Sequence, residues 1–167
     1  MSNPVAFGAA ISEDRKHGSI VAAGRSDTGK ILIDLVFYAH PRLLAARVDE
    51  LQVKHDPVAV VVNPKSQSGT LVKQLRDRGV IPLEPSAQDV AVAHGEFLDL
   101  VNDGGLEHLG QKPVTDAVRA AQQRPLAGAK AWEPRLDVDQ GPIVAATGAV
   151  WGFLRWEELS APAAWTL

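Results

Sequence analysis

The sequence predicts a mixed α/β fold, in which helices flank one central sheet, and three patterns lead to this class. Three strand-like segments joined by short polar turns open the chain, which favours an antiparallel meander. A strand, a helix and another strand follow, and this order requires a parallel crossover. The remaining residues are mostly helical in pattern. We therefore expect a mixed sheet with meander strands 1-2-3 at one edge and parallel strands 4-5 in its middle.

The meander is predicted from apolar segments at residues 4–12, 19–25 and 30–39. Their connections, EDRKHG and SDTG, are short enough for hairpins. The second connection lies in GRSDTGKI, which matches the first seven positions of a phosphate-binding loop. Ile31 lacks the hydroxyl that would contact magnesium, and it opens a strand where the motif needs a helix. We therefore expect a hairpin turn with Gly29 at positive φ, and no ATP site.

The middle of the chain alternates helices and strands. Leucine and valine residues share one face of a helix predicted within residues 40–56. Residues 58–63 read as a strand that is apolar on both faces, and residues 68–79 as a helix closed by Gly79. A short strand at residues 80–84 completes the crossover.

The C-terminal half is predicted to be helical. Ser86 and Asp89 form a capping box for a helix that reaches about Val101. A second helix is expected over residues 113–123, followed by a loop that leads to the last helix at Pro142. The buried stripe of that helix comprises Ile143, Thr147, Val150, Trp151 and Leu154.

The composition of the 167 residues indicates one ordinary globular domain spanning residues 1–167. The chain has no run of 18 apolar residues and no basic flank at its N-terminus, so we expect neither a membrane span nor a signal peptide, and a cytoplasmic location. The absence of cysteine excludes disulfides, thiolate nucleophiles and cysteine-based zinc sites. With a net charge of −3, contact with DNA would require a local basic patch.

The strand at residues 58–63 ends in Asn63, so a buried strand delivers an amide to a site at its end. Five segments, in order and spacing, resemble the C-terminal nuclease domain of phage terminase large subunits, of the actinobacteriophage type. They are FGAAISEDRKHGSIVAAG, VAVVVNPKSQSGTLVKQLRDRGV, AHGEFLDLVNDGGLEHLGQ, DAVRAAQQRPL and AWEPRLDVDQGPIVAATGAVWG. The resemblance covers nearly the whole chain. It implies a ribonuclease H-like fold and the metal-dependent cleavage of concatemeric viral DNA during packaging.

In that family, carboxylates hold two Mg²⁺ or Mn²⁺ ions about 3.5 to 4 Å apart. The resemblance places the first acid at Ala10, the second at Asn63 and the third at Asp139. Two of the three anionic ligands are therefore replaced, although the amide oxygen of Asn63 can still bind a metal ion without contributing charge. Asp137 is the nearest acid that could assist Asp139 in holding a metal ion. Without the resemblance, Asp139 would be interpreted only as a cap or a favourable charge at the start of the last helix.

Two groups of basic residues are candidates for phosphate contacts on either side of one cleft. The candidates are Lys65, Lys73, Arg76, Arg124, Lys130 and Arg135. A solvated charged surface is an equally good interpretation, because acids are interleaved with them. His94 lies on an apolar helical stripe and is interpreted as a hydrogen-bonded core or boundary residue. Its weaker alternative is a place beside the cleft.

The replaced acids predict a terminase-like nuclease fold with weak or no catalysis, because a pair of cations would lack the charge that offsets their repulsion. The alternative is a non-catalytic module, derived from a terminase, that binds DNA or another protein. Double-stranded DNA is the expected partner, and portal or ATPase-subunit packaging proteins are further candidates. Two questions stay open: whether the acids were lost naturally or by engineering, and whether the chain is an excised domain or a separate protein.

Overall fold

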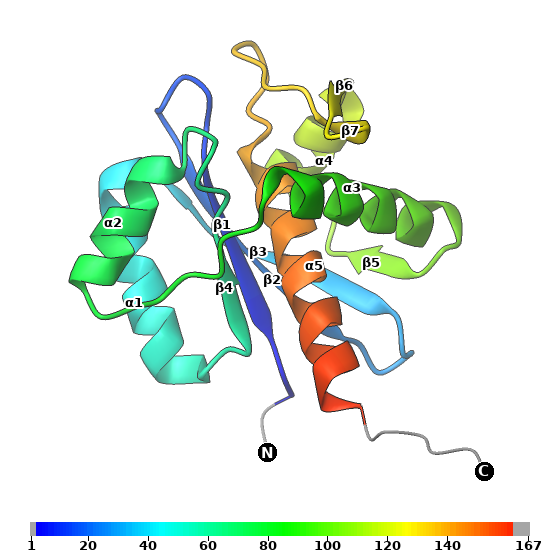
Figure 1. Ribbon diagram of the computed structural model, residues 1–167, viewed down its shortest axis with the longest axis horizontal. Coiled ribbons are helices and arrows are strands. Elements are labelled where there is room, and N and C mark those ends of the chain that lie inside the picture. Colours follow the sequence, from blue (N-terminus) through cyan, green and yellow to red (C-terminus); the bar gives the residue numbers. More distant parts are fainter. Residues whose placement is uncertain (1–2, 162–167) are drawn as a thin grey trace.

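The computed structural model describes residues 3–161, and a five-stranded mixed sheet runs through its centre (Figure 1). In spatial order its strands are β4 (Ala59–Val61), β1 (Ala6–Ile11), β2 (Gly18–Arg25), β3 (Ile31–Ala39) and β5 (Leu106–His108). Strands β1, β2 and β3 form the predicted antiparallel meander. Strand β4 pairs parallel to β1, and β5 pairs parallel to β3. The predicted fold class is confirmed.

The meander was predicted at one edge of the sheet, and this prediction was wrong. The meander lies in the centre of the sheet, between the two parallel strands. Each outer strand of a meander has one unpaired edge, so a parallel strand can add on either side. The strand predicted at residues 80–84 is reduced to one parallel bridge between Val61 and Leu83. Strand β5, which the sequence did not predict, takes the other edge. Its three residues are too few to show a periodic pattern.

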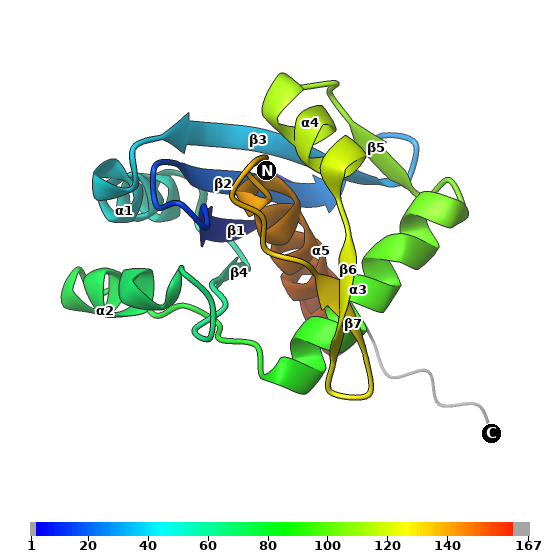
Figure 2. The same ribbon diagram turned by 90° about the horizontal axis from the view of Figure 1, so that it is seen from above.

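Helices cover both faces of the sheet (Figures 1 and 2). A 3-10 turn (Pro41–Leu43) leads into α1 (Leu44–His55), and α1 lies with α2 (Gly69–Asp77) over one face. The other face carries α5 (Gly141–Ser160), against which α3 (Ala87–Asn102) and α4 (Lys112–Ala120) pack. The sheet is therefore the middle layer of three, with a hydrophobic core on each side.

Strand β1 is buried on both faces because it lies between these layers. Its odd-numbered residues, such as Phe7, belong to the core beneath α1 and α2, whereas Ala6 and Ala10 belong to the core beneath α5. Helix α5 comes very close at Gly8, where a Cβ atom would lie 1.9 Å from the backbone oxygen of Ala145. Small residues on β1 thus allow α5 to lie directly on the strand.

A second sheet of two strands was missed by the sequence analysis. The strands β6 (Gln123–Leu126) and β7 (Ala129–Trp132) form an antiparallel hairpin within the segment predicted as a loop. The turn residues Ala127 and Gly128 both have positive φ, at 48° and 79°. Asn-Gly usually marks such a turn, so alanine at the first position hides the signal. Helix α4 accordingly ends at Ala120, before the predicted end.

Other local predictions are confirmed. The side chain of Ser86 accepts a hydrogen bond from the Asp89 backbone at 3.1 Å, and the Asp89 carboxylate accepts one from the Ser86 backbone at 3.0 Å. Gly29 has φ 83° in a hairpin turn, as expected in place of a phosphate loop. The predicted stripe of α5 is buried except at Leu154, which is half-buried. Within residues 3–161, no helix is both long and apolar enough to cross a membrane.

Candidate functional site

The candidate site lies where β1, β3 and β4 end, beside the N-terminus of α5. Ala10 pairs with Ser19, and Ser19 pairs with Tyr38, so these residues form one row across the sheet. Asn63 follows β4, whose parallel register with β1 brings it toward Ala10 at this edge. Asp139 precedes α5 and contacts the other end of the row at Tyr38. The three positions predicted for acids therefore lie at one edge of the sheet.

Asp139 uses both carboxylate oxygens in hydrogen bonds within the protein. Its Oδ1 accepts from the backbone N–H of Gly141 at 2.7 Å, which supports the start of α5. Its Oδ2 accepts from the Tyr38 hydroxyl at 2.9 Å. The ring of His17 stacks on Tyr38, with the ring centroids 4.8 Å apart. This geometry agrees with the interpretation of Asp139 as a residue that stabilises the helix start.

Tyr38 should resist ionisation at alkaline pH. Burial, followed by the hydrogen bond to Asp139, raises the pKa of its hydroxyl above the ordinary value of about 10. Tyr38 is the only tyrosine of the chain, so phenolate absorbance reports on it alone. We expect a spectrophotometric titration to show ionisation well above pH ~10. The variant Asp139→Ala should bring the transition back toward the ordinary value.

The raised pKa of Tyr38 also makes stability depend on pH. Below a pH of about 10 both the folded and the unfolded chain keep the proton, and the contribution of Tyr38 is fully present. Above it the unfolded chain releases the proton first, so the free energy of unfolding falls as pH rises toward the folded pKa. In Tyr38→Phe this fall should be smaller, as measured by urea denaturation at successive pH values. An identical pH profile in both proteins would contradict the assignment.

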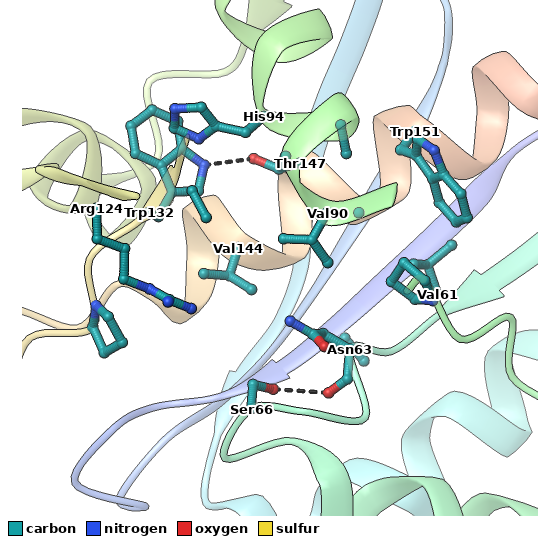
Figure 3. A pocket seen from close by; sticks show the side chains of 16 residues that line it. Val61, Asn63, Ser66, Val90, His94, Arg124, Trp132, Val144, Thr147 and Trp151 are labelled. Atoms are coloured by element: carbon teal, nitrogen blue, oxygen red, sulfur yellow. Dashed lines mark hydrogen bonds between the residues drawn. The ribbon is translucent and has the colours of Figure 1, made fainter. Parts of the chain in front are cut away.

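Asn63 is held by the loop that follows it. Its Oδ1 accepts from the backbone N–H of Lys65 at 3.0 Å, and its backbone oxygen accepts from the Ser66 hydroxyl at 2.8 Å. The second contact holds the backbone of the loop, and the first fixes the orientation of the side-chain amide. Its nitrogen therefore points away from the loop and into a neighbouring pocket (Figure 3).

Several cavities open near this edge within residues 3–161, and two of them are lined by a position predicted for an acid. The first, which we call the aromatic pocket, has a volume of about 100 Å³ and is lined by residues that include Asn63, His94, Arg124, Trp132 and Trp151. The second, which we call the acidic cleft, has a volume of about 620 Å³ and is lined by residues that include Tyr38, Asp116, Arg119, Asp137 and Asp139. Ala10 lines neither, since it is buried beneath α5. Asn63 thus lines the aromatic pocket, and Asp139 lines the acidic cleft.

The other acids of the acidic cleft are paired with basic residues. Asp116 lies 2.5 Å from the ammonium group of Lys112, and Asp137 lies 2.5 Å from the guanidinium group of Arg135. The hydrogen bond from Arg135 lowers the pKa of Asp137. Among residues 3–161, no three His, Cys, Asp or Glu side chains are grouped so that they could hold a metal ion. Asp137 therefore lies beside Asp139 but does not extend it into a ligand cluster.

The residues at the three positions predicted for acids do not fit a pair of divalent cations. Mg²⁺ and Mn²⁺ prefer charged oxygen ligands, and a two-metal centre needs several of them to offset its positive charge. A methyl group, an amide and one hydrogen-bonded carboxylate stand at these positions.

The predicted phosphate-binding residues divide into two sets. One set is engaged in ion pairs with nearby carboxylates: Lys73, Arg76 and Arg135. The other set forms no ion pair within residues 3–161: Lys65, Arg124 and Lys130. Of this second set, Arg124 lines the aromatic pocket, and Lys65 follows Asn63 in the sequence. Lys130 adds slightly to the effect of burial in lowering the pKa of His94, so it lies on the same side of the molecule as that ring.

His94 is a core residue and also borders the aromatic pocket. Only 3% of it is exposed, and its ring meets that of Trp132 edge to face at a centroid distance of 4.2 Å. The predicted burial is confirmed, but the predicted hydrogen bond is absent, since neither ring nitrogen has a partner within residues 3–161. Burial lowers the pKa of His94; the nearby amide of Gln123 opposes this without forming a hydrogen bond of normal geometry.

Three residues of this region were missed by the sequence analysis as site residues. Tyr38 is the next-to-last residue of β3, and the sequence gives no sign that it meets Asp139, 101 positions away. Trp132 lies in the hairpin that was predicted as a loop, and its indole N–H donates to the Thr147 hydroxyl at 2.9 Å. Trp151 was predicted only as a buried residue of the last helix. The available signal was that two of the four tryptophans, Trp132 and Trp151, lie close to Asp139 in the sequence.

The sheet order, the buried β1 beneath α5 and the site edge define a ribonuclease H-like fold of the kind found in large-terminase nuclease domains. The large terminase of bacteriophage HK97 superimposes with a TM-score of 0.72 at 14% identity, over 90% of this chain. The large terminase nuclease of thermophilic phage G20c gives 0.72 at 14% identity, over 91% of this chain and 83% of its own. The nuclease domain of bacteriophage SPP1, solved with bound Mn, gives 0.55 at 13% identity, over 88% of this chain and 85% of its own.

These likenesses concern the fold, and the predicted ribonuclease H-like fold is confirmed by them. The chain spans 40% of the length of the HK97 large terminase. The G20c nuclease has also been solved with bound magnesium. No protein-family model matches the sequence, and no curated protein is significantly similar to it.

Proposed function

We propose that this chain is a terminase-type nuclease domain that binds double-stranded DNA and does not cut it. The observation that carries the proposal is the chemistry at the three acid positions. Ala10 offers a methyl group, Asn63 offers an uncharged amide, and Asp139 is the one carboxylate. The fold supports an origin in viral DNA packaging, because its structural neighbours include large terminases.

Electrostatics argues against a two-metal reaction at this edge. Two divalent cations about 4 Å apart repel each other by roughly 17 kcal/mol at an effective dielectric constant of about 20. Three carboxylates offset most of that repulsion in the family pattern, but a single carboxylate cannot. Both oxygens of Asp139 already accept hydrogen bonds, so metal binding there would also compete with Tyr38 and with the start of α5.

Contact with DNA is supported by the basic residues that no acid neutralises. Lys65, Arg124 and Lys130 belong to two elements far apart in the chain, the loop after β4 and the β6–β7 hairpin, and Arg124 lines the aromatic pocket. Lysine and arginine bind phosphates mainly by charge and release counterions when they do so. These three residues are therefore the candidates for phosphate contacts.

Purified protein is expected to leave supercoiled plasmid intact in the presence of either Mg²⁺ or Mn²⁺, because the site edge lacks the ligands for both ions. Gel electrophoresis after prolonged incubation measures nicked and linear products. The variant Asp139→Ala serves as the control for a contaminating nuclease. Robust metal-dependent nicking that disappears in Asp139→Ala would overturn the proposal.

The protein is also expected to bind duplex DNA with an affinity that falls steeply with salt. Removing two phosphate contacts in Lys65→Met/Lys130→Met should reduce the slope of log K against log salt by about 2 units. The matched control is Lys30→Met/Lys54→Met, which removes two exposed lysines at the opposite edge of the sheet. Fluorescence anisotropy of a labelled duplex at several salt concentrations measures the affinity and the slope for the parent and for both double variants. If the parent binds no DNA even at low salt, a protein-interaction module becomes the better assignment.

A further inference from the structure

His94 is a buried ionisable side chain that the proposed function does not use. It lies in α3 with 3% of its surface exposed, and neither ring nitrogen has a hydrogen-bond partner within residues 3–161. Burying a polar group without a partner costs free energy, and burying an unpaired charge costs more. The neutral imidazole is therefore tolerated in this place, whereas the imidazolium would need either a carboxylate or water.

The charged residues that face His94 from the neighbouring elements are basic. Arg124 of β6 lines the aromatic pocket together with His94, and the lining of that pocket includes no acid. Lys130 of β7 adds to the effect of burial in lowering the pKa of His94. Residues 144–151 of α5, which supply another wall of the pocket, carry no charged side chain. A proton on His94 would therefore be repelled by its surroundings.

The acids that lie nearest to His94 along the chain do not compensate for this. Most of them have partners elsewhere: Glu84 pairs with Arg76, Asp89 accepts from the backbone of Ser86, and Glu96 pairs with Arg155 of α5. Asp99 is an exposed residue of α3, and Glu133, which follows β7, lines a neighbouring cavity. No carboxylate is thus placed to stabilise the imidazolium while the ring is buried.

The β6–β7 hairpin covers His94 and is held by side-chain packing. The ring of Trp132 meets that of His94 edge to face at 4.2 Å, and its indole N–H donates to Thr147 at 2.9 Å (Figure 3). The hairpin is a sheet of its own. Within residues 3–161, its residues 123–132 form no backbone hydrogen bond with another element. Few interactions would therefore break if it detached, as in the local openings of a folded protein.

We propose that His94 is a pH-sensitive switch whose protonation releases the β6–β7 hairpin from α3. In the open form, water reaches the ring and solvates the imidazolium. Burial lowers the pKa of His94 in the closed form below the ordinary value of about 6.5, so the open form takes up the proton first. The closed form is therefore fully stable above that pH and loses stability as the pH falls toward its own pKa.

Opening would also move Arg124 and Lys130, because both belong to the hairpin. They are two of the three candidates for phosphate contacts, so the switch would make contact with DNA depend on pH. That consequence alone rests on the proposed function.

Amide hydrogen exchange, followed by mass spectrometry from about pH 5 to about pH 8 and corrected for the intrinsic rate, measures the opening without DNA. Below about pH 6.5, protection of residues 123–132 should fall by up to about tenfold per pH unit, because opening takes up one proton. Strands β1 and β2 should keep their protection, because the opening is local. In His94→Phe, which keeps an aromatic ring but cannot ionise, protection of the hairpin should not change with pH. The matched control His55→Phe, at an exposed histidine of α1, should keep the profile of the parent.

A parent hairpin whose protection is independent of pH would overturn the inference, and so would an unchanged profile in His94→Phe. A parallel loss of protection in β1 would also contradict it, since the unfolding would then be global. If His94→Phe does not fold, His94→Gln repeats the test with a polar side chain that has no charge at any pH used. The switch and the proposed function can fail independently, because no step of the experiment uses DNA.

Discussion

The double variant Ala10→Asp/Asn63→Asp is expected to acquire a metal-dependent stability that the parent lacks, together with metal-dependent nicking of plasmid DNA. Ala10 is 1% exposed, so a carboxylate there without a cation should cost about 3 kcal/mol or more. A divalent cation at 100 times its dissociation constant stabilises the folded state by about 2.7 kcal/mol. That corresponds to a rise in melting temperature of roughly 5 to 10 °C for a chain of this size.

The effect is measured by thermal unfolding with Mn²⁺ and with a chelator, alongside the plasmid assay. Adding Tyr38→Phe to the double variant frees Oδ2 of Asp139 and should increase the metal-dependent shift. The matched control is Ala10→Asn, which has nearly the same size but no charge, and which should be destabilised without rescue by the cation. A folded double variant that neither binds metal nor nicks DNA would show that this edge has lost more than its acids.

The variant Gly8→Ala is expected to lose at least 4 kcal/mol of folding free energy, or to fail to fold, on the scale of the largest single-residue effects. Its new Cβ atom would lie 1.9 Å from the backbone oxygen of Ala145 and 2.8 Å from the backbone nitrogen of Ala149. Backbone atoms of a long helix cannot turn aside as a flexible side chain can. Relief therefore requires α5 to move away from β1, which would open the core beneath it.

Gly95→Ala is the matched control, because this glycine lies in the interior of α3 with no atom within 4 Å of an added Cβ. Alanine there should leave stability unchanged or raise it by up to about 1 kcal/mol, through better helix propensity. Urea denaturation followed by tryptophan fluorescence compares the two. A Gly8→Ala protein within about 1 kcal/mol of the parent would contradict the close approach of α5 to β1.

Much of the fold was predictable because its signals are local. The capping box of Ser86 and Asp89, the positive φ of Gly29 and the buried stripe of α5 each depend on residues within a few positions of one another. Strand β5 and the β6–β7 hairpin were missed because one is three residues long and the other turns at Ala127. The strand predicted at residues 80–84 was wrong in the other direction. Its apolar residues suggest a strand, but the segment forms only one bridge, between Val61 and Leu83.

At the candidate site, the sequence specifies the residue types but not their geometry. The sequence alone determined that an alanine, an asparagine and one aspartate stand at Ala10, Asn63 and Asp139, and hence how little negative charge they provide. Only the tertiary structure decided that Asn63 faces the aromatic pocket while Asp139 faces the acidic cleft beside Tyr38. The physical reason is that residue types fix charge and ligand chemistry at each position. The cavity that a side chain enters depends on packing between segments that lie far apart in the chain.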